Sequence, residues 1–588
     1  MKDRFLVTTA LENTWPSDAR PVLFLGEWCR LYSKKDCWLD MDAEVVPYHW
    51  DDRGKLYQDY EYLQALFERL LIELTVELNN IHDVDHTSRH WRILIGPWLM
   101  VFLSIIYDRW ECLHKAIDTY SIEKTIVYDG PDLKYVPQSM EHFSVLAKTD
   151  EWNHVIYSSI LKFINFDKTL AVNSLGAKDE KISIALPTRR NILSKIKKML
   201  FASTSFFSRA NNYFFIEPYL SLPDLVKLQV KLGQIPVIYQ GKNYANFTLS
   251  CNSRSWQLRG FKSSNKFEEF AREIIPAQLP LTYLEGYKKL ISQVRNNYWP
   301  AKPKLIWTSN SFYMDDPFKS WAASKVDDGV PLIIGQHGGH YGQGLFSFTE
   351  YHELAISDRY LTWGWKNDDR KITPIGAFKK SVERKKKKHS PRSMLFLLSG
   401  TSRYSGGLIS VPVSSQWIDY MDDQMAFYSG LPDKIANDTV VRLYPSDYGW
   451  SQSSRWKDKF PTSKICDRKT SFKDQLLSTK LVVSGWNSTT YLETMLSDIP
   501  TVIFWDYKYF ELRPDAIASF EELKKFGIFH DTPLSASNHI KKIWDDVDEW
   551  WANEDVNIAK MRFVKKYANS DSVLDKLNSV FRDISKRN

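Results

Sequence analysis

The segment most able to do chemistry covers residues 481–504 and reads LVVSGWNSTTYLETMLSDIPTVIF. An apolar run, a polar turn, a short helical stretch and a second apolar run predict a strand, turn, helix and strand. Thr490 and Glu493 have the spacing of a capping box, so we expect the helix to begin at Thr490. A helix start offers unpaired N–H groups and the positive end of the helix dipole, and it therefore favours an anion.

Small polar side chains crowd this predicted helix start. We predict that their hydroxyl and amide groups, with the backbone, bind a nucleotide phosphate. An ordinary capped helix in a parallel sheet is the alternative. The residues of the predicted phosphate site are Ser484, Gly485, Asn487, Ser488, Thr489 and Thr490.

A glycine-rich loop comes earlier in the chain. Residues 331–344 read PLIIGQHGGHYGQG and contain five glycines. Glycines allow close approach of backbone to a ligand, and a histidine there can be a general base or an electrophile. The loop matches neither the P-loop nor the dinucleotide-binding pattern. We predict a functional loop with His337 as its catalytic residue, and a buried structural loop is the alternative. The other members of the loop are Gln336, Gly338, Gly339 and His340.

Carboxylates follow this loop. We predict catalytic roles for Glu350 and Asp358, because paired carboxylates supply the base or nucleophile of glycosyl chemistry. His352 and Glu353 lie between them. Each acid taken singly is also typical of a helix cap or a surface charge.

Four further residues could contact a ligand. Ser399 follows a predicted strand and opens a turn rich in hydrogen-bond donors. Arg442 ends another predicted strand, where a guanidinium can form a fork to phosphate or carboxylate, although an interdomain salt bridge would explain it too. Lys508 and Arg513 follow the last predicted strand and either close over a ligand or stay solvated.

Composition bounds the class of protein. A chain of 588 residues is too long for one core, and 43% hydrophobic with 25% charged residues is typical of a globular protein. The net charge of +7 is modest for this length, and no nucleic-acid-binding signature is present. The basic run at residues 384–389 predicts a solvated linker, with contact to an anionic membrane surface as the alternative.

Cysteine usage and hydropathy predict a cytoplasmic protein. The five cysteines are odd in number and lack paired metal spacing, which fits a reducing compartment. The N-terminus has early charges and no apolar signal region. The longest apolar span, residues 93–107, is short of the roughly 20 residues that cross a bilayer.

Metal ligation is not predicted. Asp40 and Asp42, and Asp83 and Asp85, have the D-x-D spacing of metal-dependent sugar transferases. Neither pair follows a predicted buried strand, and a cap or turn explains the acids.

The predicted organisation is α/β, with two Rossmann-like doubly wound domains. We expect an N-terminal domain at residues 1–383 with a helical insertion at about 140–300, a C-terminal domain at 390–570, and a last helix at 571–588 that packs back on the first domain. The predicted strands are residues 4–9, 22–27, 125–128, 304–307, 330–334, 361–363, 394–398, 440–443, 481–483 and 501–504, and the predicted helices include 55–80, 92–116, 191–201 and 271–295.

Two levels of resemblance add to these expectations. The two Rossmann-like halves, the Gln336-His337-Gly338 loop and the Ser484-to-Glu493 turn resemble a GT-B glycosyltransferase. Residues 6–16, 24–32, 47–53 and 336–339 resemble a bacterial transferase family of surface-carbohydrate loci, first defined from a leptospiral protein. The second resemblance covers nearly the whole chain.

The resemblance implies a metal-independent glycosyltransferase without a cofactor. A nucleotide-sugar, for example a CMP-ulosonic acid such as CMP-Kdo, is the implied co-substrate, and the C-terminal domain would hold it. Glu493 would reach a ribose hydroxyl and Arg442 would balance charge. The implied acceptor is a surface polysaccharide, lipopolysaccharide or flagellin, reached from the cytoplasm or from the inner face of the membrane. The alternatives are a polyol-phosphate transferase and a non-catalytic scaffold of polysaccharide assembly.

Overall fold

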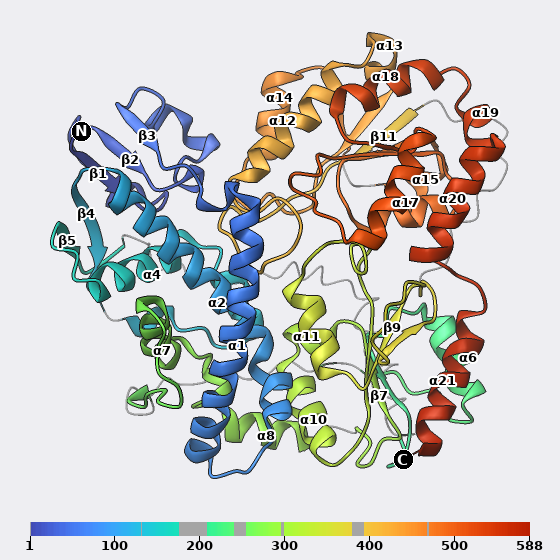
Figure 1. Ribbon diagram of the computed structural model, residues 1–588, viewed down its shortest axis with the longest axis horizontal. Coiled ribbons are helices and arrows are strands. Elements are labelled where there is room, and N and C mark those ends of the chain that lie inside the picture. The colour runs from blue at the N-terminus through green and yellow to red at the C-terminus, as the bar shows by residue number, and fades with distance from the viewer. Residues whose placement is uncertain are drawn as a thin grey trace.

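The protein consists of three parallel β-sheets with helices packed between and around them (Figure 1). The computed structural model describes residues 2–130, 132–175, 208–239, 241, 254–295, 299–378, 393–466 and 470–587. The predicted linker at 384–389, the domain boundary placed there and the predicted helix at 191–201 lie outside these residues.

The first sheet, the N-terminal sheet, has the strand order β3-β2-β1-β4-β5, and all its pairs are parallel. The order reverses beside β1, which is the Rossmann order without its sixth strand. Its strands are β1 (Arg4–Val7), β2 (Val22–Phe24), β3 (Ala43–Val45), β4 (Ile122–Tyr128) and β5 (Thr169–Val172).

The second sheet, the middle sheet, has its strands in simple sequence order from β6 to β10, again all parallel. Its three central strands are almost completely buried, which is why they read as continuous apolar runs in the sequence. The strands are β6 (Phe214–Ile216), β7 (Ile306–Thr308), β8 (Leu332–Gly335), β9 (Arg359–Thr362) and β10 (Ile372–Pro374).

The third sheet, the C-terminal sheet, has the order β13-β12-β11-β14-β15-β16. Numbered within the sheet this is 3-2-1-4-5-6, the full Rossmann order, so the order reverses between β11 and β14. The strands are β11 (Ser393–Leu397), β12 (Thr439–Arg442), β13 (Lys464–Ile465), β14 (Thr479–Ser484), β15 (Thr501–Phe504) and β16 (Phe529–His530).

Helices connect the strands, as parallel pairing requires. The α-helices are α1 (Arg53–His82), α2 (Ser88–Thr119), α3 (Met140–Leu146), α4 (Asp150–Phe163), α6 (Leu222–Lys231), α7 (Lys266–Gln278), α8 (Tyr287–Arg295), α9 (Ser311–Met314), α10 (Asp316–Asp327), α11 (Phe348–Ile356), α12 (Gln416–Ser429), α13 (Asp433–Asn437), α14 (Gln452–Lys459), α15 (Phe472–Leu477), α16 (Thr489–Leu496), α17 (Pro514–Lys525), α18 (Pro533–Ile543), α19 (Val547–Ala552), α20 (Glu554–Tyr567) and α21 (Val573–Arg587). Short 3-10 helices are η1 (Glu12–Thr14), η2 (Glu27–Cys29), η3 (Tyr32–Cys37), η4 (His49–Asp51), η5 (Asp132–Tyr135) and η8 (Leu281–Tyr283).

The long helices α1 and α2 stand between the N-terminal and middle sheets (Figure 1). In the described part of the chain, α2 alone is long and apolar enough to cross a membrane, but 89% of its most apolar stretch is buried inside the protein. Asp52 caps α1 and Thr87 caps α2 through their side chains. The apolar length of α2 is therefore explained by its position in the core, where residues on all its faces are covered.

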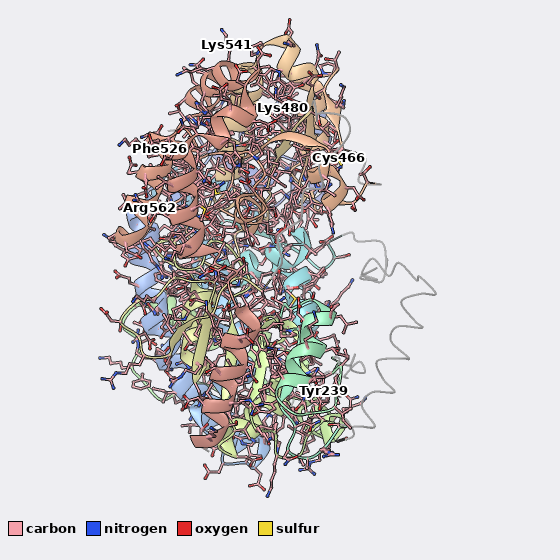
Figure 2. The ribbon with its side chains drawn as sticks, turned by 90° about the vertical axis from the view of Figure 1, so that its right-hand side faces the viewer. Tyr239, Cys466, Lys480, Phe526, Lys541 and Arg562 are labelled. Atoms are coloured by element: carbon pink, nitrogen blue, oxygen red, sulfur yellow. The ribbon has the colours of Figure 1, made fainter. Side chains whose placement is uncertain are left out.

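The last helix lies against the middle sheet. Figures 1 and 2 both show α21 beside α6. The ring of Phe581 packs on Phe215 of β6 and on Trp307 of β7, with centroids 5.4 and 5.2 Å apart. At the edge of this contact Lys231 pairs with Asp575.

The predicted α/β class is confirmed, with parallel Rossmann-like sheets and interleaved helices. The described residues hold three sheets, one more than we predicted. The difference arises because β5 and β6 lie in the region interpreted as a helical insertion. They are only four and three residues long, and a strand this short at a sheet edge has too few residues to show a pattern.

Candidate functional site

The carboxyl ends of the middle and C-terminal sheets meet at one point. The Gly339 amide, in the loop after β8, donates to Thr489 Oγ1 at the start of α16 over 3.0 Å. A Cβ atom on Gly339 would lie 2.5 Å from the carbonyl oxygen of Ser488. The two backbones are therefore in direct contact, and the glycine loop packs against the α16 start.

The start of α16 differs by one residue from the prediction and has a different cap. Ser488 is the N-cap, because its backbone is extended and its hydroxyl accepts from the Thr490 amide. Thr490 therefore lies inside the helix. The side chains of Ser488, Thr489 and Thr490 are only half-buried. Asn487 is buried, and its Oδ1 accepts a hydrogen bond from Tyr491.

The predicted phosphate residues lie beside the reversal point of the C-terminal sheet. Ser399 follows β11, Ser484 ends β14 and Gly485 comes directly after it; the strand order reverses between β11 and β14. In open parallel sheets a ligand binds outside the carboxyl ends at this point. The Ser399 amide donates to Tyr420 Oη, and Gly485 packs against the Gln424 side chain.

Two other residues predicted to bind the donor, Arg442 and Glu493, do not lie at the first residues of α16. Arg442 donates to Gln475 Oε1 over 2.6 Å and lies over the Phe472 ring, so its guanidinium turns toward α15. Glu493 lies one turn into α16 and is half-buried. The structure therefore does not bring Arg442 to the start of α16.

His337 belongs to a buried polar network. Its Nε2 is 3.2 Å from Tyr341 Oη, and its buried Nδ1 is 3.7 Å from Glu353 Oε1. Tyr341 and Tyr360 both donate to the Glu353 carboxyl, over 2.6 and 2.9 Å. Burial lowers the pKa of His337 to about 4 and raises the pKa of Glu353 well above its usual value. Both nitrogens of His337 thus face inward, and the ring is uncharged at neutral pH.

Glu353, which we named only as part of a carboxylate-rich segment, is therefore the acid that lies beside His337. Glu350, the predicted catalytic acid, lies in the first turn of α11 and accepts from Arg513 over 2.8 Å. Burial raises the pKa of Glu350 and the Arg513 charge opposes this shift. Glu350 is thus committed to an ion pair.

Asp358 lies at the opposite edge of the middle sheet. It precedes β9, accepts from the Leu332 amide at the start of β8, and pairs with Arg89 over 2.8 Å. The His337 loop follows the other end of β8. The structure therefore separates Asp358 from His337 by the length of the strand.

The remaining loop residues shape the loop itself. Gln336 is buried, and its Oε1 accepts from the Trp363 amide and from Trp365 Nε1. Its amide group donates to the Gly338 carbonyl over 2.8 Å. His340 is packed in the protein, and burial lowers its pKa to about 3. These contacts hold the loop in one conformation.

The segment at residues 511–513, in the C-terminal half, forms backbone hydrogen bonds with the same loop and acts as a clamp on it. The Leu345 amide donates to the Glu511 carbonyl, and the Arg513 amide donates to the Gln343 carbonyl. Glu511 also forms a two-pronged ion pair with Arg53 at the start of α1. Arg513, predicted to close over a ligand or stay solvated, instead joins the loop to this clamp, whereas Lys508 contacts the neighbouring Tyr509 ring.

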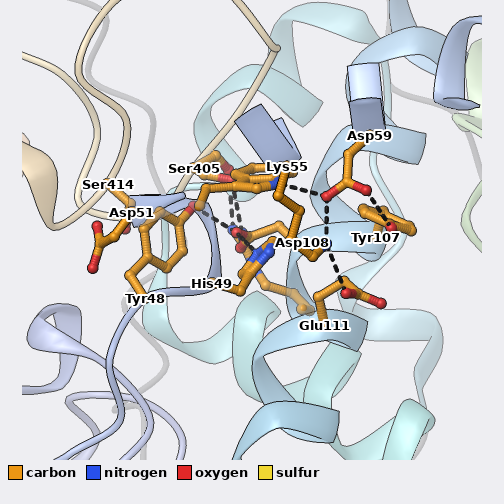
Figure 3. A network of polar contacts seen from close by, with 12 residues as sticks. Tyr48, His49, Asp51, Lys55, Asp59, Tyr107, Asp108, Glu111, Ser405 and Ser414 are labelled. Atoms are coloured by element: carbon orange, nitrogen blue, oxygen red, sulfur yellow. Dashed lines mark hydrogen bonds and ion pairs between the residues drawn. The ribbon is translucent and has the colours of Figure 1, made fainter. Parts of the chain in front are cut away.

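The segment at residues 47–53, which carries part of the family resemblance, lies at the boundary with the C-terminal half. Figure 3 shows Tyr48 and His49 reaching Asp108, with Ser405 close by. Tyr48 Oη donates to Asp108 over 2.6 Å and His49 Nε2 is 3.1 Å from it. Arg109 completes the network through Asp108 and the Ser405 carbonyl. The motif therefore joins two parts of the chain.

Two groups of potential metal ligands occur among the described residues. His86, His90 and Asp327 form one, and His49, Asp108 and Cys112 form the other. The rings of His86 and His90 are stacked 3.6 Å apart and almost parallel. A metal about 2 Å from both ring nitrogens would have to lie in both ring planes, which stacked rings do not allow. In the second group the Asp108 carboxylate already forms a buried ion pair with Arg109. We draw no metal site from either group.

The buried neutral histidines predict acid sensitivity. The pKa of His337 is about 4 in the folded protein, against 6.5 when unfolded, so below pH 6.5 the unfolded chain binds the proton more readily. Stability should therefore fall between pH 6.5 and 4, by up to about 1.4 kcal/mol per pH unit for this one group. Thermal unfolding midpoints of the protein and of His337→Gln, compared from pH 7 to pH 4.5, measure the effect. The gap between them should shrink on acidification, and a constant gap would contradict the assigned pKa.

Two parallel, Rossmann-like sheets meet here, with a helix start on one and a glycine loop on the other. The chain belongs to the LIC12162 family transferases, whose model matches residues 4–579. The predicted transferase class is thereby confirmed. No protein of curated function matches the chain.

Three solved structures that match part of this chain have low sequence identity and low TM-scores. The wall teichoic acid polymerase TagF with CDPG is 8% identical, with a TM-score of 0.32, over 68% of this chain and 98% of TagF. HepE of Anabaena with UDP-glucose is 10% identical, with a TM-score of 0.35, over 64% of this chain and 100% of HepE. MurG of Acinetobacter baumannii is 11% identical, with a TM-score of 0.30, over 65% and 96%.

Proposed function

We propose that this transferase moves a sugar from a nucleotide-activated donor to a surface polysaccharide, lipopolysaccharide or flagellin acceptor. One observation carries the proposal: the half-exposed hydroxyls at the α16 start lie at the reversal point of a Rossmann sheet and face the glycine loop of another sheet. This arrangement offers an anion the backbone amides of a half-buried helix start at the point where two sheets meet.

In this proposal the donor phosphate lies in front of α16, between Ser488 and Thr490 on one side and the Ser399 turn on the other. As the acceptor oxygen bonds to the sugar carbon, the bond from that carbon to the phosphate oxygen breaks and its electron pair stays on the phosphate. Helix amides and the dipole of α16 stabilise this charge. No resident cofactor is needed, and a donor with one phosphate, such as a CMP-ulosonic acid, suits a site with few cations.

We place the reaction in the cytoplasm, with peripheral contact at the inner face of the membrane as an alternative. The odd number of cysteines and the lack of paired metal spacing in the sequence support this placement.

Nucleotide titration tests the donor site. Titration with CMP, UDP and GDP by calorimetry should show binding of one of them, and Thr490→Val should weaken it about tenfold or more, because a hydrogen bond to a charged group is lost. Ser497→Ala, at the other end of α16, is the matched control and should leave the Kd unchanged. Absence of binding at millimolar concentrations of all three nucleotides would refute the proposed donor site.

A transfer assay with labelled donors separates a sugar transferase from a polyol-phosphate transferase. Donors labelled in the sugar or in the phosphate are incubated with the protein and acceptor. Label from the sugar alone in the product supports the proposal, and phosphate label in the product supports the alternative reaction.

A further inference from the structure

The segment Glu217-Pro218-Tyr219 directly follows β6 and has an unusual backbone. Glu217 has a φ of 43° and Tyr219 a φ of 65°, so two bulky residues flanking a proline adopt the left-handed region. Such residues cost of order 1–3 kcal/mol each and occur where function requires a particular side-chain position. The strained backbone therefore fixes the direction in which these two side chains leave the chain.

The strained backbone aims both side chains at the carboxyl edge of the middle sheet. The Ser309 amide, after β7, donates to the Glu217 carbonyl over 3.1 Å, and Ser311 Oγ donates to Glu217 Oε2 over 3.2 Å. The Tyr219 ring lies 6.4 Å from the His337 ring, centroid to centroid. Glu217 is therefore fixed on the same edge as the glycine loop.

Of the three glutamates Glu217, Glu350 and Glu353, Glu217 is the one whose carboxylate is exposed and can meet a substrate. Glu350 is paired with Arg513, and Glu353 is buried against two tyrosines. Glu217 is exposed, and within the described ranges no lysine, arginine or histidine forms an ion pair with it. Both nitrogens of His337 face inward. An acceptor hydroxyl at this edge would meet the Glu217 carboxylate rather than the imidazole.

A second carboxyl supports this assignment. Asp315 is largely buried near Glu217, and burial, with a smaller contribution from the Glu217 charge, raises its pKa to about 7. Asp315 caps α10 by accepting from the Phe318 amide, so two carboxyls lie together beside this edge of the sheet.

We propose that Glu217 contacts the acceptor hydroxyl and acts as the general base of the transfer, an inference that rests on the proposed function. The hydroxyl proton moves to a Glu217 carboxylate oxygen while the acceptor oxygen bonds to the sugar carbon and the phosphate leaves with its electron pair. Ser311 orients the carboxylate, and His337 contacts Tyr219 and Tyr341 beside it.

The test compares the protein with Glu217→Gln, Glu217→Asp and Glu269→Gln, the last an exposed acid on α7. UDP-glucose, GDP-mannose, CMP-N-acetylneuraminate and CDP-glycerol serve as donors, and nucleotide release is measured with and without added formate, alongside nucleotide Kd and thermal midpoint. Glu217→Gln should lower kcat by about 10²- to 10⁴-fold, with Kd and midpoint unchanged. Formate should restore part of the rate, Glu217→Asp should retain a measurable rate, and Glu269→Gln should match the native protein.

The outcomes separate this inference from the proposed function. If the native protein releases nucleotide and Glu217→Gln stays within about threefold of it, the assignment of Glu217 is overturned while the transferase proposal stands. A loss of rate that formate does not relieve, together with a lower midpoint, shows a structural role and also overturns it. If the native protein acts on none of the donors and binds no nucleotide, both proposals fail.

Discussion

Gly339→Ala is expected to lower the transfer rate by about 10²-fold, because displacement of a loop by roughly 1 Å is enough for such a loss. The added Cβ would lie 2.5 Å from the Ser488 carbonyl oxygen and 2.8 Å from Thr489 Cα. Both are backbone atoms of the α16 start, so the loop or the helix must shift. Either shift breaks the hydrogen bond from the Gly339 amide to Thr489 Oγ1 and moves the loop away from the proposed phosphate site. Donor turnover and nucleotide Kd measure the effect.

Gly344→Ala is the matched control in the same loop. The nearest atom to a Cβ there is Ser410 Cβ at 3.5 Å, an ordinary van der Waals distance. This variant should keep the native rate within about threefold, since nothing must move. Equal rates for Gly339→Ala and the native protein would show that the contact between loop and helix does not matter for transfer.

Arg109→Leu is expected to destabilise the protein by about 3–5 kcal/mol, because it leaves the Asp108 charge buried without its partner. Both side chains are about 1% exposed. Burial alone would raise the pKa of Asp108, yet Arg109 and hydrogen bonds from His49 and Tyr48 keep it below its usual value. Urea unfolding followed by circular dichroism measures the loss, as the difference in unfolding free energy between Arg109→Leu and the native protein for the same transition.

Two variants control this prediction. Arg20→Leu breaks exposed ion pairs with Asp18 and Glu123, and it should cost at most about 1 kcal/mol. Adding Asp108→Asn to Arg109→Leu removes the unpaired charge and should recover much of the loss. A cost for Arg109→Leu no larger than that for Arg20→Leu would contradict the buried ion pair.

Long strands and helices could be predicted from the sequence because their patterns extend over many residues. The strands that became β11, β14 and β15 are continuous apolar runs bounded by turn residues, and α1 and α2 show repeated apolar faces. Strand β6 was not predicted. Its three residues, Phe214–Ile216, are followed by Glu217 and Pro218, and an apolar triplet before a proline turn was the one signal available.

Within the candidate site, residue types were predictable but partners were not. The glycine loop and the polar turn before α16 were both recognised from composition. Glu350 and Glu353 lie three residues apart on α11, and the sequence alone cannot rank them. Packing directs Glu353 to His337 and Glu350 to Arg513. Arg442 ends a strand as predicted, but which neighbour its guanidinium meets depends on α15.

The amino-acid sequence by itself determined the α/β class, the two loops able to bind an anion or a substrate, and membership of a transferase family, because these depend on local pattern and composition. The tertiary structure decided that the two loops touch, that Asp358 lies at the far edge, and that Glu217 joins the site. These relations join residues more than 90 positions apart in the chain or the two ends of one strand. Local propensity carries no information about such distances, since they follow from how whole sheets pack against one another.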